Sequence, residues 1–526
     1  GIAHDAADLS HVAARGLGQR LHTETLAADR GTIFDAEGRE LALTVDSVTV
    51  YANPQEVTEP AVEARYLASL TGQDPGELAR LLGGDGSFVY VARQLDPATA
   101  DRVRAAGLPG VYFLEEPKRV YPAGSLTAQV VGFVQPDSNA GLEGLELQYE
   151  EELSGTPGQL RVERDPAGRT IPQGEYTVTP AEPGSDLVLT LRTSIQFAAT
   201  QALAEALERT GARAGSVVVL DPATGGILAM VNLPGFDPEM RSSLQPEQVR
   251  NRAVTDLFEP GSTQKLVTIA AALEAGLVEP GTVLEIPERI EILDTVFQDF
   301  TEHPAQLTVT EIVAHSSNLG TILLGEMLGA QRLHDFMIGF GQGRITGVDF
   351  PGEAPGVVRP VEDWCLTTCV AGTSIGYHVS VTALQMAMAY SAIANDGVWV
   401  RPHFVAEIVD GQGSRLAMEP ERVQVVSAVT ARQMREMLAA VVESGTGALA
   451  AVEGYRVAGK TGTTKKYLDA TGAYSDEDVV ASFIGLAPVD RPRVVIAVVL
   501  DAPQEDASGG KGAAPVFAAV MLAALH

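Results

Sequence analysis

Two pairs of apolar, strand-like segments stand at opposite ends of a long helical stretch in this chain. The first pair lies in residues 214–234, where two apolar runs are joined by Asp-Pro-Ala-Thr-Gly-Gly, a turn sequence that favours a hairpin. The second pair lies in residues 479–488 and 493–503, and helical periodicity dominates the intervening chain up to about residue 445. Strands so far apart predict an α+β fold, with one antiparallel sheet assembled from distant segments and covered by helices.

The pattern of apolar residues in the sequence changes near residue 190. Residues 30–190 alternate short apolar segments with many turns, whereas residues 193–213 carry apolar side chains at helical spacing. A chain of 526 residues is long enough to form more than one domain. We therefore predict a mixed, loop-rich N-terminal domain over residues 1–190 and a second domain over residues 191–526.

The chain carries 68 acidic and 37 basic residues, which gives a net charge of −31. Because this excess repels a phosphate backbone, we expect no nucleic-acid partner. No apolar run reaches the roughly 20 residues that a membrane-spanning helix needs, and the first residues lack the pattern of a signal peptide. The sequence alone leaves open a cytosolic chain and one from which an N-terminal segment has been removed.

Lysine is rare, with six residues among the 37 basic ones, and one lysine follows a serine by three positions. In Ser262-Thr-Gln-Lys265, which comes directly after Pro260-Gly261, a helix is predicted to begin and the two side chains share a face. A desolvated lysine can take the proton of a nucleophilic serine hydroxyl. A second serine and lysine at this spacing, in residues 508–511, flank two glycines, so we interpret that segment as a loop and a chance match.

Two further motifs carry polar groups suited to a substrate. Ser316-Ser-Asn318 lies between helical segments and offers a hydroxyl and an amide, although such a turn is more often a helix cap. Residues 459–464, Gly-Lys-Thr-Gly-Thr-Thr, combine glycines that permit close backbone approach with a cation and hydroxyls that can hold a carboxylate.

The same segment completes a phosphate-binding pattern, because residues 454–461 match GxxxxGK[ST]. A nucleotide-binding loop of this kind needs a helix directly after its Lys-Thr, so that the helix N-terminus faces the phosphates. The residues that follow Thr461 are strand-like and then turn-like. The ATPase interpretation is therefore a remote alternative.

The two cysteines, Cys365 and Cys369, stand four residues apart with no histidine beside them. They cannot form a disulfide framework, and they match neither a zinc site nor a CxxC redox motif. We interpret them as structural thiols, because a spacing of four on a helix is poor geometry for a bridge, although an oxidising compartment leaves a disulfide conceivable.

Taken together and in this order, the Ser-x-x-Lys, Ser-x-Asn and Lys-Thr-Gly motifs resemble those of penicillin-binding transpeptidases. Residues 30–42, with the later YPAGSLTAQVVGFV and GLEGLELQYEEELSG, resemble the pedestal of class B, monofunctional members, and no glycosyltransferase signature is present. The end of the chain soon after the last motif and the sequence KTGTTKK are most similar to the division-specific FtsI type. The resemblance implies a transpeptidase fold with an all-helical region on an elongated pedestal, residues 1–190.

The resemblance also implies a serine D,D-transpeptidase that cross-links peptidoglycan stem peptides during septal wall synthesis and is acylated by β-lactams. The resemblance implies no cofactor and no metal for this enzyme. The residues so assigned are Ser262 as nucleophile, Lys265 as its base, Ser316 and Lys460 as a proton relay, Asn318, Thr461, Gly462 and Thr463 as substrate-binding residues, and the backbone N–H groups of Ser262 and Thr463 as the oxyanion hole.

Partners and location follow from the same resemblance. The implied partners are stem peptides ending in D-Ala-D-Ala, β-lactams, a SEDS-type glycosyltransferase and other divisome proteins. The protein would lie on the extracytoplasmic face of the membrane, tethered by an N-terminal helix absent from this chain. Alternatives are an elongation-type transpeptidase, a β-lactam-hydrolysing or β-lactam-sensing serine protein, and a non-enzymatic scaffold.

Overall fold

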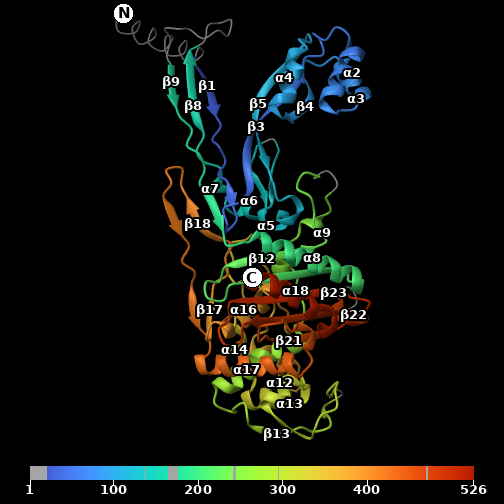
Figure 1. The fold of residues 1–526 in the computed structure, drawn as a ribbon, viewed down its shortest axis with the longest axis vertical. Coiled ribbons are helices and arrows are strands. Elements are labelled where there is room, and N and C mark those ends of the chain that lie inside the picture. Colours follow the sequence, from blue (N-terminus) through green and yellow to red (C-terminus); the bar gives the residue numbers. More distant parts are fainter. Residues whose placement is uncertain are drawn as a thin grey trace, which may run out of the picture.

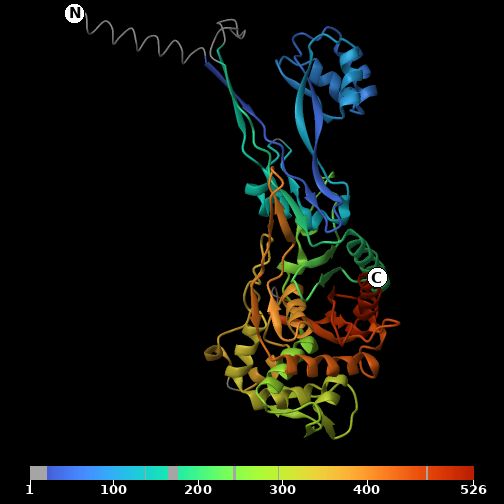
Figure 2. The ribbon, with the colours of Figure 1, turned by 60° about the vertical axis from the view of Figure 1, so that its left-hand side comes forward.

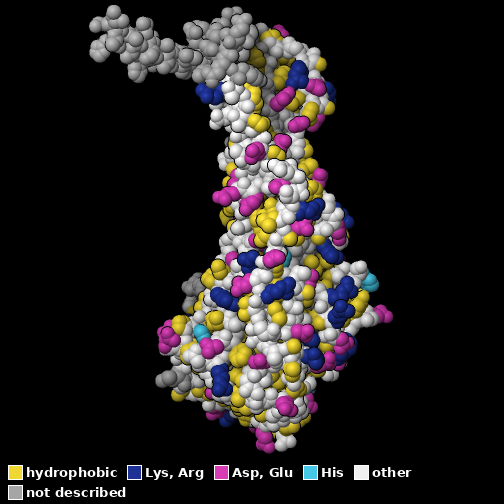
Figure 3. Space-filling view, turned by 90° about the vertical axis from the view of Figure 1, so that its left-hand side faces the viewer, with side chains coloured by type: hydrophobic (Ala, Val, Ile, Leu, Met, Phe, Trp, Pro, Cys, Tyr) yellow, Lys and Arg dark blue, Asp and Glu magenta, His cyan; other side chains and the backbone are white. Residues whose placement is uncertain are grey.

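A computed structural model describes residues 21–136, 138–163, 176–240, 244–293, 295–365, 367–468 and 472–526. The molecule is elongated, with most of the described residues before 190 at one end and most of those after 190 at the other (Figures 1 and 2). No helix in these described ranges is long and apolar enough to cross a membrane. Acidic and basic side chains are interspersed over the face in Figure 3, as expected for a solvated surface.

The far end of the pedestal consists of an arm and a separate lobe (Figure 1). The arm is an antiparallel sheet of β1 (Leu21–Leu26), β8 (Gly158–Glu163) and β9 (Tyr176–Thr179). In the lobe, Val50 and Leu67 belong to a small core between strands and helices. The lobe contains β3 (Glu40–Ala52), β4 (Val89–Leu95), β5 (Val111–Val120), α2 (Pro60–Thr71), α3 (Pro75–Leu82) and α4 (Pro97–Ala105).

The base of the pedestal shares its sheet with the second half of the chain. This sheet has seven strands, and β10 (Asp186–Leu189) pairs in parallel with β2 (Ile33–Phe34) and antiparallel with β18 (Val405–Val409). β18 in turn pairs with β19 (Arg415–Ala417). Residues near 405–417 therefore return to the pedestal, so the structural unit around this sheet is not limited to residues before 190.

Several short elements lie near the junction of the pedestal with the second half of the chain (Figure 1). They are η1 (Gly124–Leu126), α5 (Ala128–Val131), β6 (Phe133–Val134), β7 (Gly141–Glu143), α6 (Gly144–Gln148), α7 (Glu150–Leu153), α9 (Pro246–Val249) and α10 (Arg252–Thr255).

A five-stranded antiparallel sheet forms the centre of the second part, as predicted. Its order is β12 (Ile227–Leu233), β11 (Ala214–Leu220), β23 (Val494–Asp501), β22 (Ala473–Ala487) and β21 (Ala458–Leu468). The first two strands form the expected hairpin, and the last three come from the far end of the chain.

Helices cover both faces of this sheet. Val217 and Val219 of β11 pack in one core with α8 (Thr193–Thr210) and α18 (Ala514–Leu525), whereas Val218 and Leu220 face a second core with α16 (Ala383–Ala394). Successive strand residues point to opposite faces, so a strand buried on both sides reads as a continuous apolar run. This explains the uninterrupted Val-Val-Val-Leu sequence.

The all-helical region lies beyond the α16 face of the sheet (Figure 1). Its helices are α11 (Lys265–Glu274), α12 (Val309–Ala314), α13 (Asn318–Leu328), α14 (Ala330–Gly339), α15 (Cys369–Ser374) and α17 (Ala428–Glu443). Short strands and turns border them, namely β13 (Val283–Glu285), β14 (Ile290–Ile292), β15 (Thr295–Phe297), β16 (Gln306–Thr308), β17 (Val398–Val400), β20 (Arg422–Gln424), η4 (Val361–Asp363) and η5 (Ala448–Ala450).

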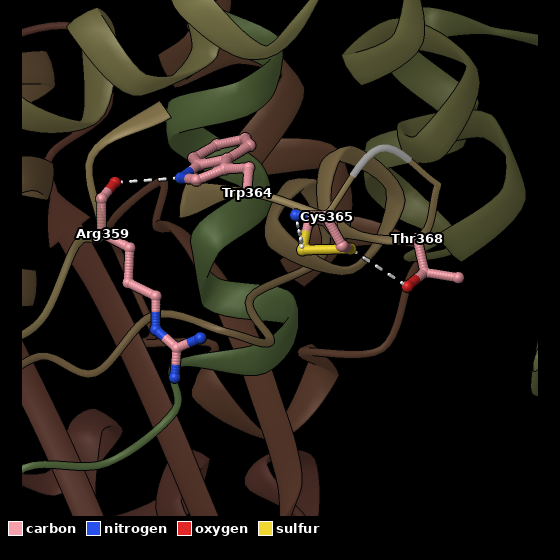
Figure 4. The surroundings of a disulfide bond; sticks show 5 residues. Arg359, Trp364, Cys365 and Thr368 are labelled. Carbon is pink, nitrogen blue, oxygen red and sulfur yellow. Dashed lines mark hydrogen bonds between the residues drawn. A yellow bond between two sulfur atoms is a disulfide. The ribbon is translucent and has the colours of Figure 1, made fainter. Parts of the chain in front are cut away.

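Cys365 and Cys369 form a disulfide, so the prediction of two structural thiols is wrong (Figure 4). Only Cys369 lies on a helix, at the start of α15, whereas Cys365 precedes the helix. The Cα atoms are 5.3 Å apart, well within the range that a disulfide bridges. The objection from helical spacing therefore does not apply. The neighbouring Trp364 indole N–H donates to the carbonyl of Arg359 (2.9 Å).

Candidate active site

Ser262 and Lys265 lie in consecutive turns at the start of one helical segment. Ser262 belongs to the 3₁₀ turn η3 (Gly261–Gln264), and Lys265 is the first residue of α11. Gly261 and Gly376 both have positive φ, and a Cβ on Gly376 would lie 2.2 Å from the Gly261 carbonyl oxygen. Only a glycine at position 376 lets the two backbones meet, so this contact fixes where the serine turn begins.

The amine of Lys265 is fully buried and lies within hydrogen-bond distance of three acceptors in the Ser-x-Asn motif. Its acceptors are the carbonyl oxygen of Ser316 (2.6 Å), the Ser316 hydroxyl (3.2 Å) and Oδ1 of Asn318 (2.8 Å). Within the described part of the chain, no residue makes a hydrogen bond with the Ser262 hydroxyl. Proton transfer from Ser262 to Lys265 therefore requires the amine to exchange one of its present acceptors.

Lys460 reaches the same hydroxyl from the sheet. Its amine, also fully buried, donates to the Ser316 hydroxyl (2.8 Å) and to the carbonyl of Thr461 (3.2 Å). Ser316 itself has a φ of +57°, in the left-handed region that a residue with a side chain rarely adopts. This conformation occurs between α12 and α13, where the serine hydroxyl bridges two lysines from distant parts of the chain.

Burial lowers the proton affinity of both amines. It holds the pKa of Lys265 well below its usual range, with a further decrease from the nearby charge of Lys460 and an opposing effect of Asp299. Burial also lowers the pKa of Lys460 to about 7. An amine with a pKa lowered in this way is available as a neutral base near neutral pH, which is what a serine nucleophile needs.

The Lys-Thr-Gly segment lies on edge strand β21 and leaves one threonine facing outward. Thr463 is exposed, and its hydroxyl accepts the N–H of Gly509 (3.1 Å), whereas the hydroxyl of Thr461 lies 2.9 Å from that of Thr446. A Cβ on Gly462 would lie 2.5 Å from the Ser482 hydroxyl, so a side chain is excluded there. Thr463 is thus presented at an accessible edge beside the buried Lys460.

Strand β21 continues from Lys460 to Leu468 without a helix. The arrangement that a nucleotide-binding loop requires is therefore missing, as the sequence predicts. The second serine and lysine pair is also not catalytic in form. Ser508 caps a single helical turn over residues 509–513, rather than the predicted loop, by accepting the backbone N–H of the exposed Lys511 (3.3 Å).

Comparison with known protein families identifies the family to which this chain belongs. Residues 215–522 match the model of the penicillin-binding protein transpeptidase domain, and residues 25–189 match that of the penicillin-binding protein dimerisation domain. This chain belongs to the class B penicillin-binding proteins. The predictions of this family, of the α+β transpeptidase fold and of a serine D,D-transpeptidase are confirmed.

Named relatives span most of this class B chain. Penicillin-binding protein PbpB of Mycobacterium tuberculosis is 38% identical over 97% of this chain and 80% of its own length. Peptidoglycan D,D-transpeptidase FtsI of Escherichia coli K12 is 34% identical over 95% of this chain and 84% of its own length. The crystal structure of penicillin-binding protein 3 from M. tuberculosis with aztreonam has a TM-score of 0.75 at 33% identity, covering 95% and 96% of the two chains.

Three residues at the site of this penicillin-binding protein escaped the sequence analysis. Gln298 accepts the side-chain N–H of Asn318 through its carbonyl oxygen (3.1 Å), Asp299 accepts the Ser317 hydroxyl (2.7 Å), and Thr446 contacts Thr461. None of them belongs to a motif, because each is distant from its partner in sequence and contacts it only in the folded chain. An isolated acid or threonine in a polar loop gives no local signal of such a role.

Proposed function

We propose that Ser262 is the nucleophile of this penicillin-binding protein and that the enzyme cross-links peptidoglycan stem peptides during septal wall synthesis. The observation that carries this proposal is the convergence of two buried amines, Lys265 and Lys460, on the Ser316 hydroxyl, with Lys265 one helical turn after Ser262. The anionic end of a D-Ala-D-Ala stem suits the exposed Thr463 of β21 beside these lysines.

Acylation begins when neutral Lys265 takes the proton of the Ser262 hydroxyl. The serine oxygen attacks the peptide carbonyl between the two D-alanines, and the backbone N–H groups of Ser262 and Thr463 stabilise the developing oxyanion. The carbon–nitrogen bond breaks, an ester forms on Ser262, and the leaving D-alanine receives a proton through Ser316 and Lys460. The hydrogen bonds of Ser316 to both lysines support this relay.

Asn318 binds the amide of the stem peptide, and Thr461, Gly462 and Thr463 line the place of its terminal carboxylate. In the second step the amine of another stem attacks the ester on Ser262, which forms the cross-link and frees the serine. A β-lactam opens on the same serine and leaves an acyl group there. Structures of M. tuberculosis penicillin-binding protein 3 with aztreonam and with ampicillin support this, as does their likeness to this chain.

The division-specific role rests on the likeness to FtsI of E. coli. By the same argument, the partners are a SEDS-type glycosyltransferase and other divisome proteins, and the transpeptidase works on the extracytoplasmic face of the membrane. The attachment to that membrane is an N-terminal helix. A co-purification experiment tests this role. We expect this protein to co-purify with the glycosyltransferase of a division complex and not with that of an elongation complex.

The test of the nucleophile is covalent labelling by a fluorescent penicillin, followed over hours with the purified chain. We expect persistent labelling of the wild type, none of Ser262→Ala, and normal labelling of Ser69→Ala, which removes an exposed hydroxyl from the distant helix α2. Rapid loss of the label would instead indicate a β-lactam hydrolase. Persistent labelling of Ser262→Ala would refute the assignment of the nucleophile.

A further inference from the structure

The loop of residues 298–303 lies between the β14–β15 hairpin and strand β16, and it contacts the N-terminus of α13. On its inner side, Ile292 and Phe297 of the β14–β15 hairpin pack on Ile322 of α13 and Ile375 beside α15. This packing holds the start of the loop, so that Gln298 and Asp299 arrive next to the Ser-x-Asn motif.

Asp299 is almost completely buried, with a side chain that is 6% exposed, and its carboxylate receives four donors. One oxygen accepts the backbone N–H groups of Asn318 and of Leu319 (3.1 Å), which are the unsatisfied donors at the start of α13. The other oxygen accepts the Ser317 hydroxyl (2.7 Å) and Nε2 of His303 (2.7 Å). A negative charge at this end of a helix is also favoured by the helix dipole.

His303 meets an acceptor at each ring nitrogen. Nδ1 lies 2.8 Å from the carbonyl oxygen of Pro304, and Nε2 lies 2.7 Å from the carboxylate of Asp299. Only the imidazolium can donate to both, so the carbonyl of Pro304 and then the carboxylate of Asp299 raise the pKa of His303. The imidazole of His303 therefore bridges the Asp299 carboxylate and the Pro304 carbonyl, and these contacts favour its protonated form.

The same loop also fixes the side chain of Asn318. Its amide N–H donates to the carbonyl of Gln298 (3.1 Å), while its Oδ1 accepts the amine of Lys265 (2.8 Å). The backbone N–H of Asn318 is bound by Asp299 at the same time. Asn318 is thus held at three points, and two of the three come from the loop.

Two charged groups, Lys460 of β21 and Asp299 of the loop, act on the Lys265 amine from the elements around it. The charge of Lys460 lowers the pKa of Lys265, and the charge of Asp299 raises it. The remaining partners of the amine, Ser316 and Asn318, are neutral. His303 lies 2.7 Å from the same carboxylate, so the charge of its protonated form would offset part of this raising effect.

We propose that Asp299, paired with His303, is a positioning residue that holds Ser317 and Asn318 at the start of α13, so that it orients Asn318 toward Lys265 and tunes the charge around that amine. The proposal rests on the proposed roles of Ser262, Lys265 and Asn318. Asp299 and His303 act through these residues and need not contact the substrate themselves.

The experiment measures the rate of acylation of the full chain by a fluorescent penicillin as a function of pH. We compare Asp299→Asn, Asp299→Glu and His303→Gln with Glu302→Gln, which removes an exposed carboxylate from the same loop. Asp299→Asn is expected to acylate about 10- to 100-fold more slowly, because a small misplacement of a catalytic group has effects up to that size. Asp299→Glu, which keeps the charge, is expected to recover part of the rate.

The acidic limb of the pH profile separates positioning from a purely structural role. Removing the negative charge in Asp299→Asn lowers the pKa of Lys265 and moves this limb to lower pH. Removing the compensating charge in His303→Gln raises the pKa of Lys265 and moves it to higher pH. Glu302→Gln is expected to keep the wild-type profile.

The proposal would be overturned if Asp299→Asn and His303→Gln both kept the wild-type acylation rate and the wild-type acidic limb. It would also be overturned if the acidic limb moved in the same direction in these two variants. If Asp299→Asn does not fold, His303→Gln decides alone, since an unmoved limb overturns the proposal and a limb at higher pH supports it. Failure of the proposed function is distinguishable, because the wild type would then not label or Ser262→Ala would label. Either result concerns the wild type or Ser262→Ala, so it is obtained without the loop variants.

Discussion

The amine of Lys460 donates to the hydroxyl of Ser316 over 2.8 Å, although 144 residues separate the two in sequence. The same hydroxyl lies 3.2 Å from the amine of Lys265. Two ammonium groups so close together repel each other, and both are fully buried. The repulsion and the burial are relieved when an amine loses its proton, which is why the pKa of each lysine is lowered and a neutral base is available at this site.

Replacing Lys460 by methionine is expected to abolish most activity and to stabilise the fold. Burial lowers the pKa of Lys460 to about 7, from 10.5. At pH 7 this shift corresponds to roughly 4 kcal/mol of lost stability as an upper limit. Because methionine also loses the hydrogen bonds to Ser316 and Thr461, we expect a gain of about 2 kcal/mol in the free energy of unfolding. Acylation should fall about 100-fold.

Urea unfolding at several pH values checks the sign of this effect. Between the folded pKa of about 7 and the unfolded value of 10.5, the unfolded chain binds more protons at this lysine, so wild-type stability rises with pH in that window. Lys460→Met should reduce this slope, whereas Lys511→Met, at an exposed lysine, should leave it unchanged. Equal slopes in all three proteins would contradict the assignment of a buried, largely neutral amine.

Asn318→Asp is expected to slow acylation at neutral pH and to move its acidic limb to higher pH. The new carboxylate would lie where Oδ1 now accepts the amine of Lys265 (2.8 Å), and an adjacent negative charge raises the pKa of a lysine. It would also face the carbonyl of Gln298 with an acceptor instead of a donor. Stopped-flow acylation over pH 5 to 9 measures both effects, and an unmoved limb would argue against Lys265 as the base.

Much of the central sheet could be predicted because local patterns are strong there. The hairpin of β11 and β12 follows from its turn sequence, and helix α8 follows from apolar spacing. The motif around Ser262 identified a helix start because Pro260 and Gly261 punctuate the chain.

The remaining features depend on contacts between distant segments. The return of β18 and β19 to the pedestal sheet is a pairing choice that no local pattern specifies. Asp299 matters only because the loop that carries it lies against α13. The disulfide was missed because the assumed helix begins only at Cys369, which leaves Cys365 free to turn toward it.

Replacing both Cys365 and Cys369 by serine is expected to reduce stability and leave acylation largely intact. Closing a loop as short as this one removes little entropy from the unfolded chain, and the expected loss is about 2 kcal/mol. Trp364 and α15 retain their other contacts, including the indole hydrogen bond to Arg359. Thermal unfolding with and without reductant measures the loss, and thiol quantification before and after denaturation verifies the bond. A reductant-insensitive wild type would contradict it.

Gly376→Ala is expected to damage both the fold and the nucleophile, whereas Gly413→Ala should damage neither the site nor the acylation rate. Both glycines have positive φ (+90° and +84°), so the backbone strain of an added Cβ, about 1 kcal/mol, is similar. At Gly413 the Cβ would meet nothing within 4 Å, but at Gly376 it would lie 2.2 Å from the carbonyl oxygen of Gly261. Something must then shift in the turn that carries Ser262.

The difference in unfolding free energy between Gly376→Ala and Gly413→Ala separates the effect of the Gly261–Gly376 contact from that of backbone strain. We expect Gly376→Ala to lose at least about 2 kcal/mol more than Gly413→Ala in urea unfolding, and to acylate about 100-fold more slowly once folded, since small displacements of a reacting group have effects of that size. A folded Gly376→Ala protein that labels with penicillin at the wild-type rate would show that the Gly261–Gly376 contact does not position the serine.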